Sequence, residues 1–109
     1  MDKQMEELVV TVSEYINRLI EGIMETAELF QSYEENKGIA FICEISEGIE
    51  WITDALVTIN KLSEKKIIEM NNKLNEVVAA LENEDYILVG DLLQYELLPV
   101  IEEINNNLL

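Results

Sequence analysis

The chain is predicted to be all-α, an antiparallel up-down-up-down four-helix bundle whose last helix is kinked at Pro99. Two sets of apolar residues recur at spacings of three and four, which puts each set on one helical face. The first set is Ile42, Ile45, Ile49, Ile52, Leu56 and Ile59, and the second is Ile67, Met70, Leu74, Val77 and Leu81. Only short polar segments separate the apolar runs, and connections of that length make consecutive helices antiparallel neighbours.

The first helix is predicted over Lys3–Gln31, with an apolar face broad enough to contact two neighbours. That face contains Met5, Leu8, Val12, Tyr15, Leu19, Ile23, Ala27 and Phe30. The polar segment Ser32–Gly38 ends this helix. Asn36 is the expected N-cap of the second helix, predicted over Lys37–Ile59.

The third helix is predicted over Glu64–Glu82, because Ser63 is a good N-cap and Glu64 adds an acid to the first turn. Asp85 or Asn83 is available to cap the last helix, which is predicted to run to Asn106.

Pro99 lies inside this last helix. Proline has no N–H to donate to the carbonyl of Tyr95, and it crowds that turn. The alternative to a kink is a break, with Pro99 as the first residue of a short final helix. The apolar stripe that continues through the proline favours the kink; it consists of Leu93, Leu97, Val100 and Ile104.

Length and composition bound the class of protein. With 109 residues, 49% of them apolar, the chain is predicted to be a single domain over residues 1–109. No segment approaches the roughly 18 uninterrupted apolar residues of a membrane span. The N-terminus lacks the basic and apolar regions of a secretory signal, so the cytoplasm is the expected compartment.

Two glycines interrupt predicted helices. Gly22 and Gly48 each cost about 1 kcal/mol relative to alanine in a helix interior. An antiparallel hairpin would bring them to nearly the same level, so we expect close approach of the two backbones there. The alternative is a pocket beside Trp51.

The net charge is −16, from 23 acids and 7 bases. Such a field repels phosphate backbones and anionic lipids, so direct binding to nucleic acid or to a membrane surface is not expected. A basic protein is the electrostatically favoured partner. The alternative interpretation is that the charge only maintains solubility.

The residues needed for most catalytic schemes are missing. The chain has no histidine, the commonest general base and metal ligand, and its one cysteine, Cys43, is expected to be a small buried apolar side chain. An acidic row on the second helix is interpreted as a solvated face rather than a metal site; it consists of Glu44, Glu47, Glu50 and Asp54. We therefore expect no enzyme activity, no metal and no cofactor.

Asp91 lies in the most apolar stretch of the chain. It is predicted to outline the solvent side of the last helix together with Gln94, Leu98 and Glu102. If it faced inward instead, its charge would need a partner such as a tyrosine hydroxyl or a lysine.

Surplus apolar surface indicates a partner. The last helix has more apolar residues than one core-facing stripe can absorb, and Phe41 lies one residue off the seam of the second helix. The candidate partner-binding residues are Phe41, Trp51, Tyr86 and Tyr95. Their partner is either a second copy, giving a homodimer through the second and last helices, or an amphipathic helix of another protein.

Two segments resemble known proteins. Ala80–Tyr86, a helix end followed by an acidic turn and a new helix, resembles a turn in flagellar export chaperones of the flagellin-binding type. Those chaperones are short acidic cytoplasmic bundles that shield an amphipathic helix of an export substrate. Asp91–Pro99 is similar to a segment of small uncharacterised proteins from low-GC Gram-positive bacteria, a likeness that implies no activity. No residue role is carried over from either resemblance.

Three hypotheses for function follow. The leading one is a non-enzymatic protein-interaction module, such as a chaperone or adaptor. The second is an acidic DNA-mimic inhibitor, whose carboxylates occupy a basic nucleic-acid-binding protein. The third is an enzyme or ligand carrier that uses a pocket near Gly22, Gly48 and Trp51.

Overall fold

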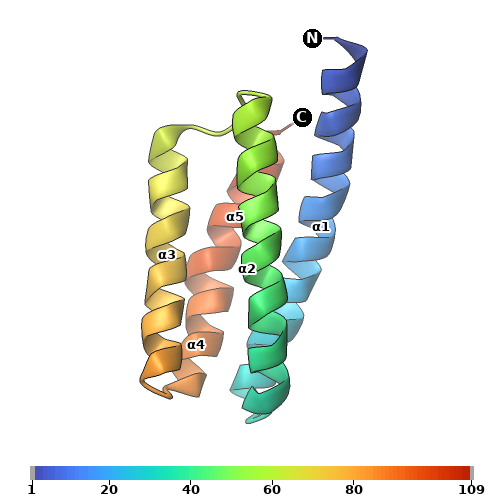
Figure 1. Ribbon diagram of the computed structural model, residues 1–109. Helices are drawn as coiled ribbons and strands as arrows, with labels where there is room; N and C mark the ends of the chain where they lie inside the picture. Colours follow the sequence, from blue (N-terminus) through green and yellow to red (C-terminus); the bar gives the residue numbers. More distant parts are fainter. Residues whose placement is uncertain (1, 109) are drawn as a thin grey trace.

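A computed structural model describes residues 2–108, and it confirms an all-α four-helix bundle (Figure 1). The helices are α1 (Lys3–Gln31), α2 (Glu35–Thr58), α3 (Glu64–Glu82) and a last helix made of α4 (Tyr86–Leu92), a π-helical turn η1 (Leu93–Leu97) and α5 (Leu98–Asn106). None of these helices is apolar over a stretch long enough to cross a membrane.

Local capping explains most of the helix boundaries. The predicted caps Ser63 and Asp85 are confirmed: Ser63 Oγ accepts a hydrogen bond from the Lys66 amide at 3.1 Å, and Asp85 Oδ1 accepts one from the Leu88 amide at 3.4 Å. The prediction for Asn36 is wrong, because α2 already begins at Glu35 and no side chain caps it.

Each of the first three helices is followed by a residue in the left-handed region. These residues are Tyr33, Asn60 and Glu84, with φ of 62°, 57° and 56°. The next amide in the chain then donates to a carbonyl of the last helical turn, as in the bond from Glu34 to Leu29 at 2.8 Å. These reversals satisfy carbonyls that the helix ends would leave open, and they turn the chain within a few residues.

The last helix is kinked before Pro99, as predicted, and a π-helical turn lies at the kink. The Leu98 amide donates to the carbonyl of Leu93, five residues back, while Leu92, Leu93, Leu97 and Leu98 all keep right-handed helical angles. The helix is therefore continuous rather than broken. The wider turn makes room for the proline ring, which would crowd the carbonyl four residues back in a regular α-helix.

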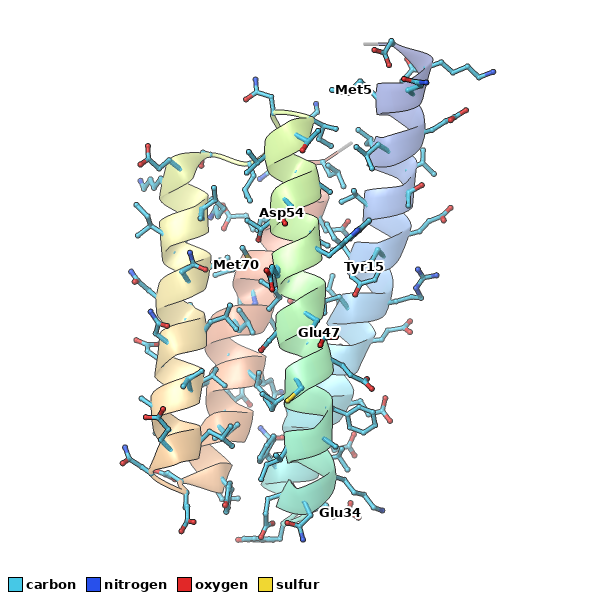
Figure 2. All side chains as sticks on the ribbon, in the orientation of Figure 1. Met5, Tyr15, Glu34, Glu47, Asp54 and Met70 are labelled. Carbon is cyan, nitrogen blue, oxygen red and sulfur yellow. The ribbon has the colours of Figure 1, made fainter. Side chains whose placement is uncertain are left out.

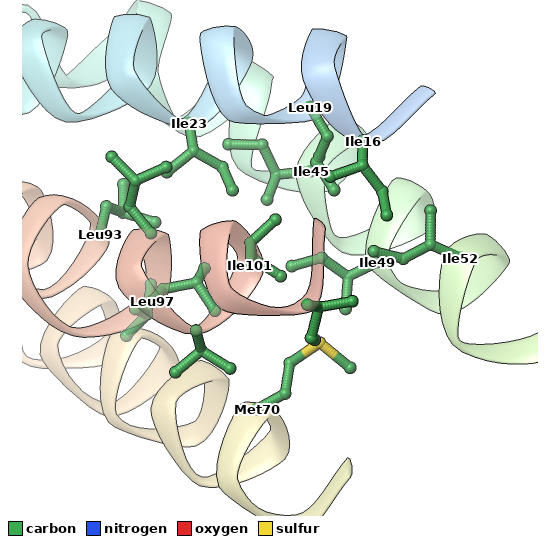
Figure 3. Close-up of a cluster of buried hydrophobic side chains, with 14 of the residues drawn as sticks. Ile16, Leu19, Ile23, Ile45, Ile49, Ile52, Met70, Leu93, Leu97 and Ile101 are labelled. Atoms are coloured by element: carbon green, nitrogen blue, oxygen red, sulfur yellow. The ribbon is translucent and has the colours of Figure 1, made fainter. Parts of the chain in front are cut away.

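The core is formed mainly by α1, α2 and the last helix (Figure 3). On α1, Val12, Ile16, Ile23 and Phe30 are completely buried, so the broad face predicted from the sequence does contact two neighbours, α2 and the last helix. The third helix contributes less: Met70, Val77 and Ala80 are buried, whereas the predicted Ile67, Leu74 and Leu81 are only half-buried. This is because α3 packs on the last helix and approaches α2 less closely.

Two ion pairs join α3 to the last helix. Lys66 Nζ lies 2.8 Å from a carboxylate oxygen of Glu103, and Lys73 Nζ lies 2.9 Å from one of Glu96. The hydrogen bond to Glu103 raises the pKa of Lys66, and that to Glu96 raises the pKa of Lys73. The charged form of each lysine is thus favoured in the folded protein.

The raised lysine pKa values predict a loss of stability at alkaline pH. An unfolded lysine titrates near 10.5, so the ion pairs stabilise the fold fully below that pH and stop doing so as the pH rises through the raised folded pKa. We expect the melting temperature of the wild type to exceed that of Lys66→Gln/Lys73→Gln at about pH 9, and this gap to narrow as the pH rises above the ordinary lysine pKa of about 10.5. Thermal unfolding followed by circular dichroism checks this, and a gap that stays constant with pH would contradict it.

Candidate functional site

Side chains of α1 pack directly on the backbone of α2 at Gly48. A Cβ at Gly48 would lie 2.7 Å from Tyr15 Oη and 3.3 Å from Leu19 Cδ1, so the tyrosine occupies the space that a side chain would take. The Tyr15 ring also contacts Trp51, with ring centroids 4.8 Å apart. The prediction of close packing at Gly48 is confirmed, although side chains of α1 rather than its backbone make the approach.

The same prediction is wrong for Gly22, because nothing lies within 4 Å of a Cβ built there. Gly22 instead opens a groove between α1 and α2, with a hollow of about 270 Å³. The groove adjoins Phe41 rather than Trp51. Its lining residues are Tyr15, Arg18, Leu19, Gly22, Glu25, Thr26, Phe41, Glu44 and Ile45.

One local hydrogen bond and two core side chains form the floor of the groove. The Thr26 hydroxyl, which is buried, donates to the Gly22 carbonyl at 2.7 Å. Leu19 and Ile45 are buried beneath the groove and belong to the core. The hollow is therefore a depression over a packed core, bounded below by apolar side chains.

One of the predicted partner-binding residues lines this groove, and a second lies next to a residue that does. Phe41 is 37% exposed and lines the hollow, while Trp51 is 42% exposed and lies against Tyr15. They are ten positions apart on α2, which corresponds to about 15 Å along the helix axis. Figure 2 shows Tyr15 on α1 where it faces α2. The three aromatic residues and the hollow form one strip, which we call the aromatic groove.

Charge surrounds the aromatic groove. Glu25 from α1 and Glu44 from α2 line it directly. Exposed carboxylates flank it farther out, including Glu14 and Glu21 on α1 and Glu47 on α2. One cation is present: the guanidinium carbon of Arg18 lies 5.8 Å from the centroid of the Tyr15 ring. An apolar strip with an acidic rim suits a partner that is apolar in the middle and basic at its edges.

The other two predicted partner-binding residues lie elsewhere. Tyr86 is half-buried at the start of α4 and stacks on Phe30, with centroids 6.1 Å apart. Tyr95 is 65% exposed on η1. The structure therefore brings Phe41 and Trp51 to one groove but does not bring Tyr86 and Tyr95 to it.

Asp91 faces α1 rather than solvent. Gln31 Nε2 donates to Asp91 Oδ1 at 3.2 Å and to Gln94 Oε1 at 2.8 Å, and both acceptors are half-buried. Leu98 is only 7% exposed. The predicted solvent side is thus wrong for these three residues, because this part of the last helix packs against α1.

The prediction for Cys43 is also wrong, since the thiol is exposed on α2. The acidic row is confirmed as a solvated face: Glu44, Glu47, Glu50 and Asp54 are all exposed, and Glu47 and Asp54 are labelled on α2 in Figure 2. Within residues 2–108, no three His, Cys, Asp or Glu side chains are grouped closely enough to hold a metal ion.

Sequence reasoning missed the contributions of α1 to the groove. Tyr15 is on the apolar face of α1 and was assigned to the core, and Arg18 received no role. One signal was available: two mid-helix glycines predicted at one level mark a place where side-chain volume is missing, and Tyr15 and Arg18 lie within one or two turns of Gly22.

The fold and this site define a small acidic four-helix bundle with an aromatic groove between its first two helices. The family described as a domain of unknown function (DUF8042) matches residues 7–107, so the chain belongs to that family. No curated protein and no solved structure matches the chain significantly.

Proposed function

We propose that this protein is a non-enzymatic interaction module that binds a basic amphipathic helix of a partner protein in the aromatic groove. The observation that carries the proposal is the unfilled hollow at Gly22 beside the half-exposed Phe41. Apolar residues of the partner helix would fill the hollow and cover Phe41 and Trp51. The proposal includes the cytoplasm as the compartment.

Charge is the reason for choosing a basic partner over a second copy. Each chain carries −16, and the groove is bordered by Glu25 and Glu44, so two copies meeting there would repel each other. A helix with lysines or arginines beside its apolar stripe would instead gain from the same carboxylates. Helix-in-groove recognition uses anchors about one turn apart on one face of the bound helix.

The proposal is tested with a displayed library of amphipathic helices of about 18 residues, a length that covers the strip from Phe41 to Trp51. The apolar stripe and the flanking charges both vary in this library. Selection on the wild type, with counter-selection on Gly22→Leu, should enrich sequences with basic flanks. Enrichment of acidic flanks, or no enrichment over the counter-selection, would contradict the proposal.

Enriched peptides are then titrated into the purified protein, with the fluorescence of its single tryptophan, Trp51, as the signal. Gly22→Leu fills the hollow and Phe41→Ser removes an anchor, so each is expected to weaken binding about tenfold or more. Ile68→Ser is the matched control, because Ile68 is a similarly exposed apolar residue on α3, at 54%. Its affinity should equal that of the wild type.

Other occupants give different results in the same experiments. A homodimer through this groove would appear by light scattering as a doubled mass that Gly22→Leu abolishes. A DNA-mimic inhibitor would bind its basic partner through Glu44, Glu47, Glu50 and Asp54 alone. Binding of that kind would be insensitive to Gly22→Leu and would be lost between about 0.05 and 0.5 M salt. Either result would replace the proposed function.

A further inference from the structure

Arg18 occupies an unusual place for a cation in so acidic a protein. It is the one arginine in the sequence, and its guanidinium lies over the Tyr15 ring, 5.8 Å from the centroid, inside the groove. This distance falls within the range of cation–π attraction. The groove therefore already holds one cationic group in the free protein.

Carboxylates do not hold Arg18 there. Among residues 2–108, no acidic side chain lies within 4.0 Å of its guanidinium, although Glu25 and Glu44 line the same groove. The contrast with α3 is clear, since Lys66 and Lys73 each contact a carboxylate at less than 3 Å. Glu25 and Glu44 are thus left available to a second cation that enters the groove.

We propose that the aromatic groove takes an arginine or lysine side chain of the partner over the Tyr15 ring, the place that Arg18 occupies in the free protein, while Glu25 and Glu44 supply uncompensated negative charge nearby. The inference rests on the proposed function. The aliphatic stem of the incoming residue lies along the hollow at Gly22, where the absence of a side chain leaves room. Arg18 is long and exposed, so it can swing into solvent.

The proposal predicts the direction in which removal of Arg18 changes the affinity for a cationic partner. If Arg18 and the incoming cation compete for one position, removal of Arg18 strengthens binding of a cationic partner. If Arg18 instead pairs with a carboxylate of the partner, its removal weakens binding. Exposed cation–π contacts are worth about 0.5 to 1 kcal/mol, which corresponds to roughly a 2- to 5-fold change in affinity.

The test uses two synthetic helical peptides of about 18 residues with a leucine stripe and lysine flanks. They differ only at one central position beside the stripe, which is arginine in one peptide and its neutral analogue citrulline in the other. Each is titrated into the wild type, Arg18→Gln and Lys65→Gln. Lys65 is an exposed lysine on α3, so its variant makes the same change in net charge away from the groove.

We expect Arg18→Gln to bind the arginine peptide roughly 2- to 5-fold more tightly than Lys65→Gln does, and the two variants to bind the citrulline peptide equally. Weaker binding of the arginine peptide by Arg18→Gln, or equal gains in both variants, would overturn the inference. If Gly22→Leu still weakens binding in that case, the proposed function stands and only the role of Arg18 is wrong. If neither peptide binds, or Gly22→Leu binds both as well as the wild type does, the proposed function fails and the inference fails with it.

Discussion

Phe30→Ala is expected to lower the free energy of unfolding by about 4 kcal/mol, a large share of the total for a domain of this size. The Phe30 ring is completely buried between α1, α2 and α4. It fills the space left by Gly38, where a Cβ would lie 2.6 Å from the ring, and it stacks on Tyr86. Alanine would leave a cavity that none of these three helices can close alone. Chemical denaturation followed by circular dichroism measures the loss.

Tyr95→Ala is the matched control for Phe30→Ala, because it also removes an aromatic ring. Tyr95 is 65% exposed, so its loss should change the free energy of unfolding by no more than about 0.5 kcal/mol. Similar effects for the two variants would show that Phe30 does not hold these helices together.

Gly90→Ala and Gly22→Ala are expected to change stability in opposite directions. A Cβ at Gly90 would lie 2.9 Å from the backbone carbonyl oxygen of Ala27 and 2.8 Å from Gln31 Cγ. A helix carbonyl cannot yield without moving α1, so we expect a net loss of about 2 kcal/mol from overpacking. Gly22 has open space, so its alanine variant should gain about 1 kcal/mol from helix propensity.

Denaturant unfolding measures the free energy of unfolding of Gly90→Ala, of Gly22→Ala and of the wild type. If both variants were more stable than the wild type, α1 and α4 would not be in close contact at Gly90. If both variants were less stable than the wild type, Gly22 would be packed and the hollow would not exist. That result would also remove the basis of the proposed binding site. The stabilised Gly22→Ala variant has a further use, because weaker peptide binding by it could not be attributed to unfolding.

The helices were predictable from the sequence to within a residue or two. Lys3–Gln31 and Glu64–Glu82 match the structure at both ends. Apolar periodicity and helix capping depend on residues three or four positions apart, so the local sequence is enough to predict where a helix begins and ends. The kink at Pro99 is also local, although its form as a π-helical turn was not predicted.

Half of the candidate site was predictable in the same way. Phe41 was identified because it exceeds what one core-facing stripe can bury, and it lines the groove; Trp51, named beside it, lies against Tyr15. Tyr86 was selected by the same criterion but stacks on Phe30, a residue far away in the sequence. Periodicity shows that an apolar residue is in surplus, but it does not show whether a distant helix covers it.

The sequence by itself determined an all-α bundle, its four helices and the acidic surface that favours a basic partner. Only the tertiary structure decided that Gly22 opens a groove while Gly48 and Gly90 are packed, and that Cys43 is exposed. The physical reason is that helix formation depends on neighbours along the chain. The space beside a residue depends on side chains from another helix, and their position is set by how α1, α2 and the last helix pack as a whole.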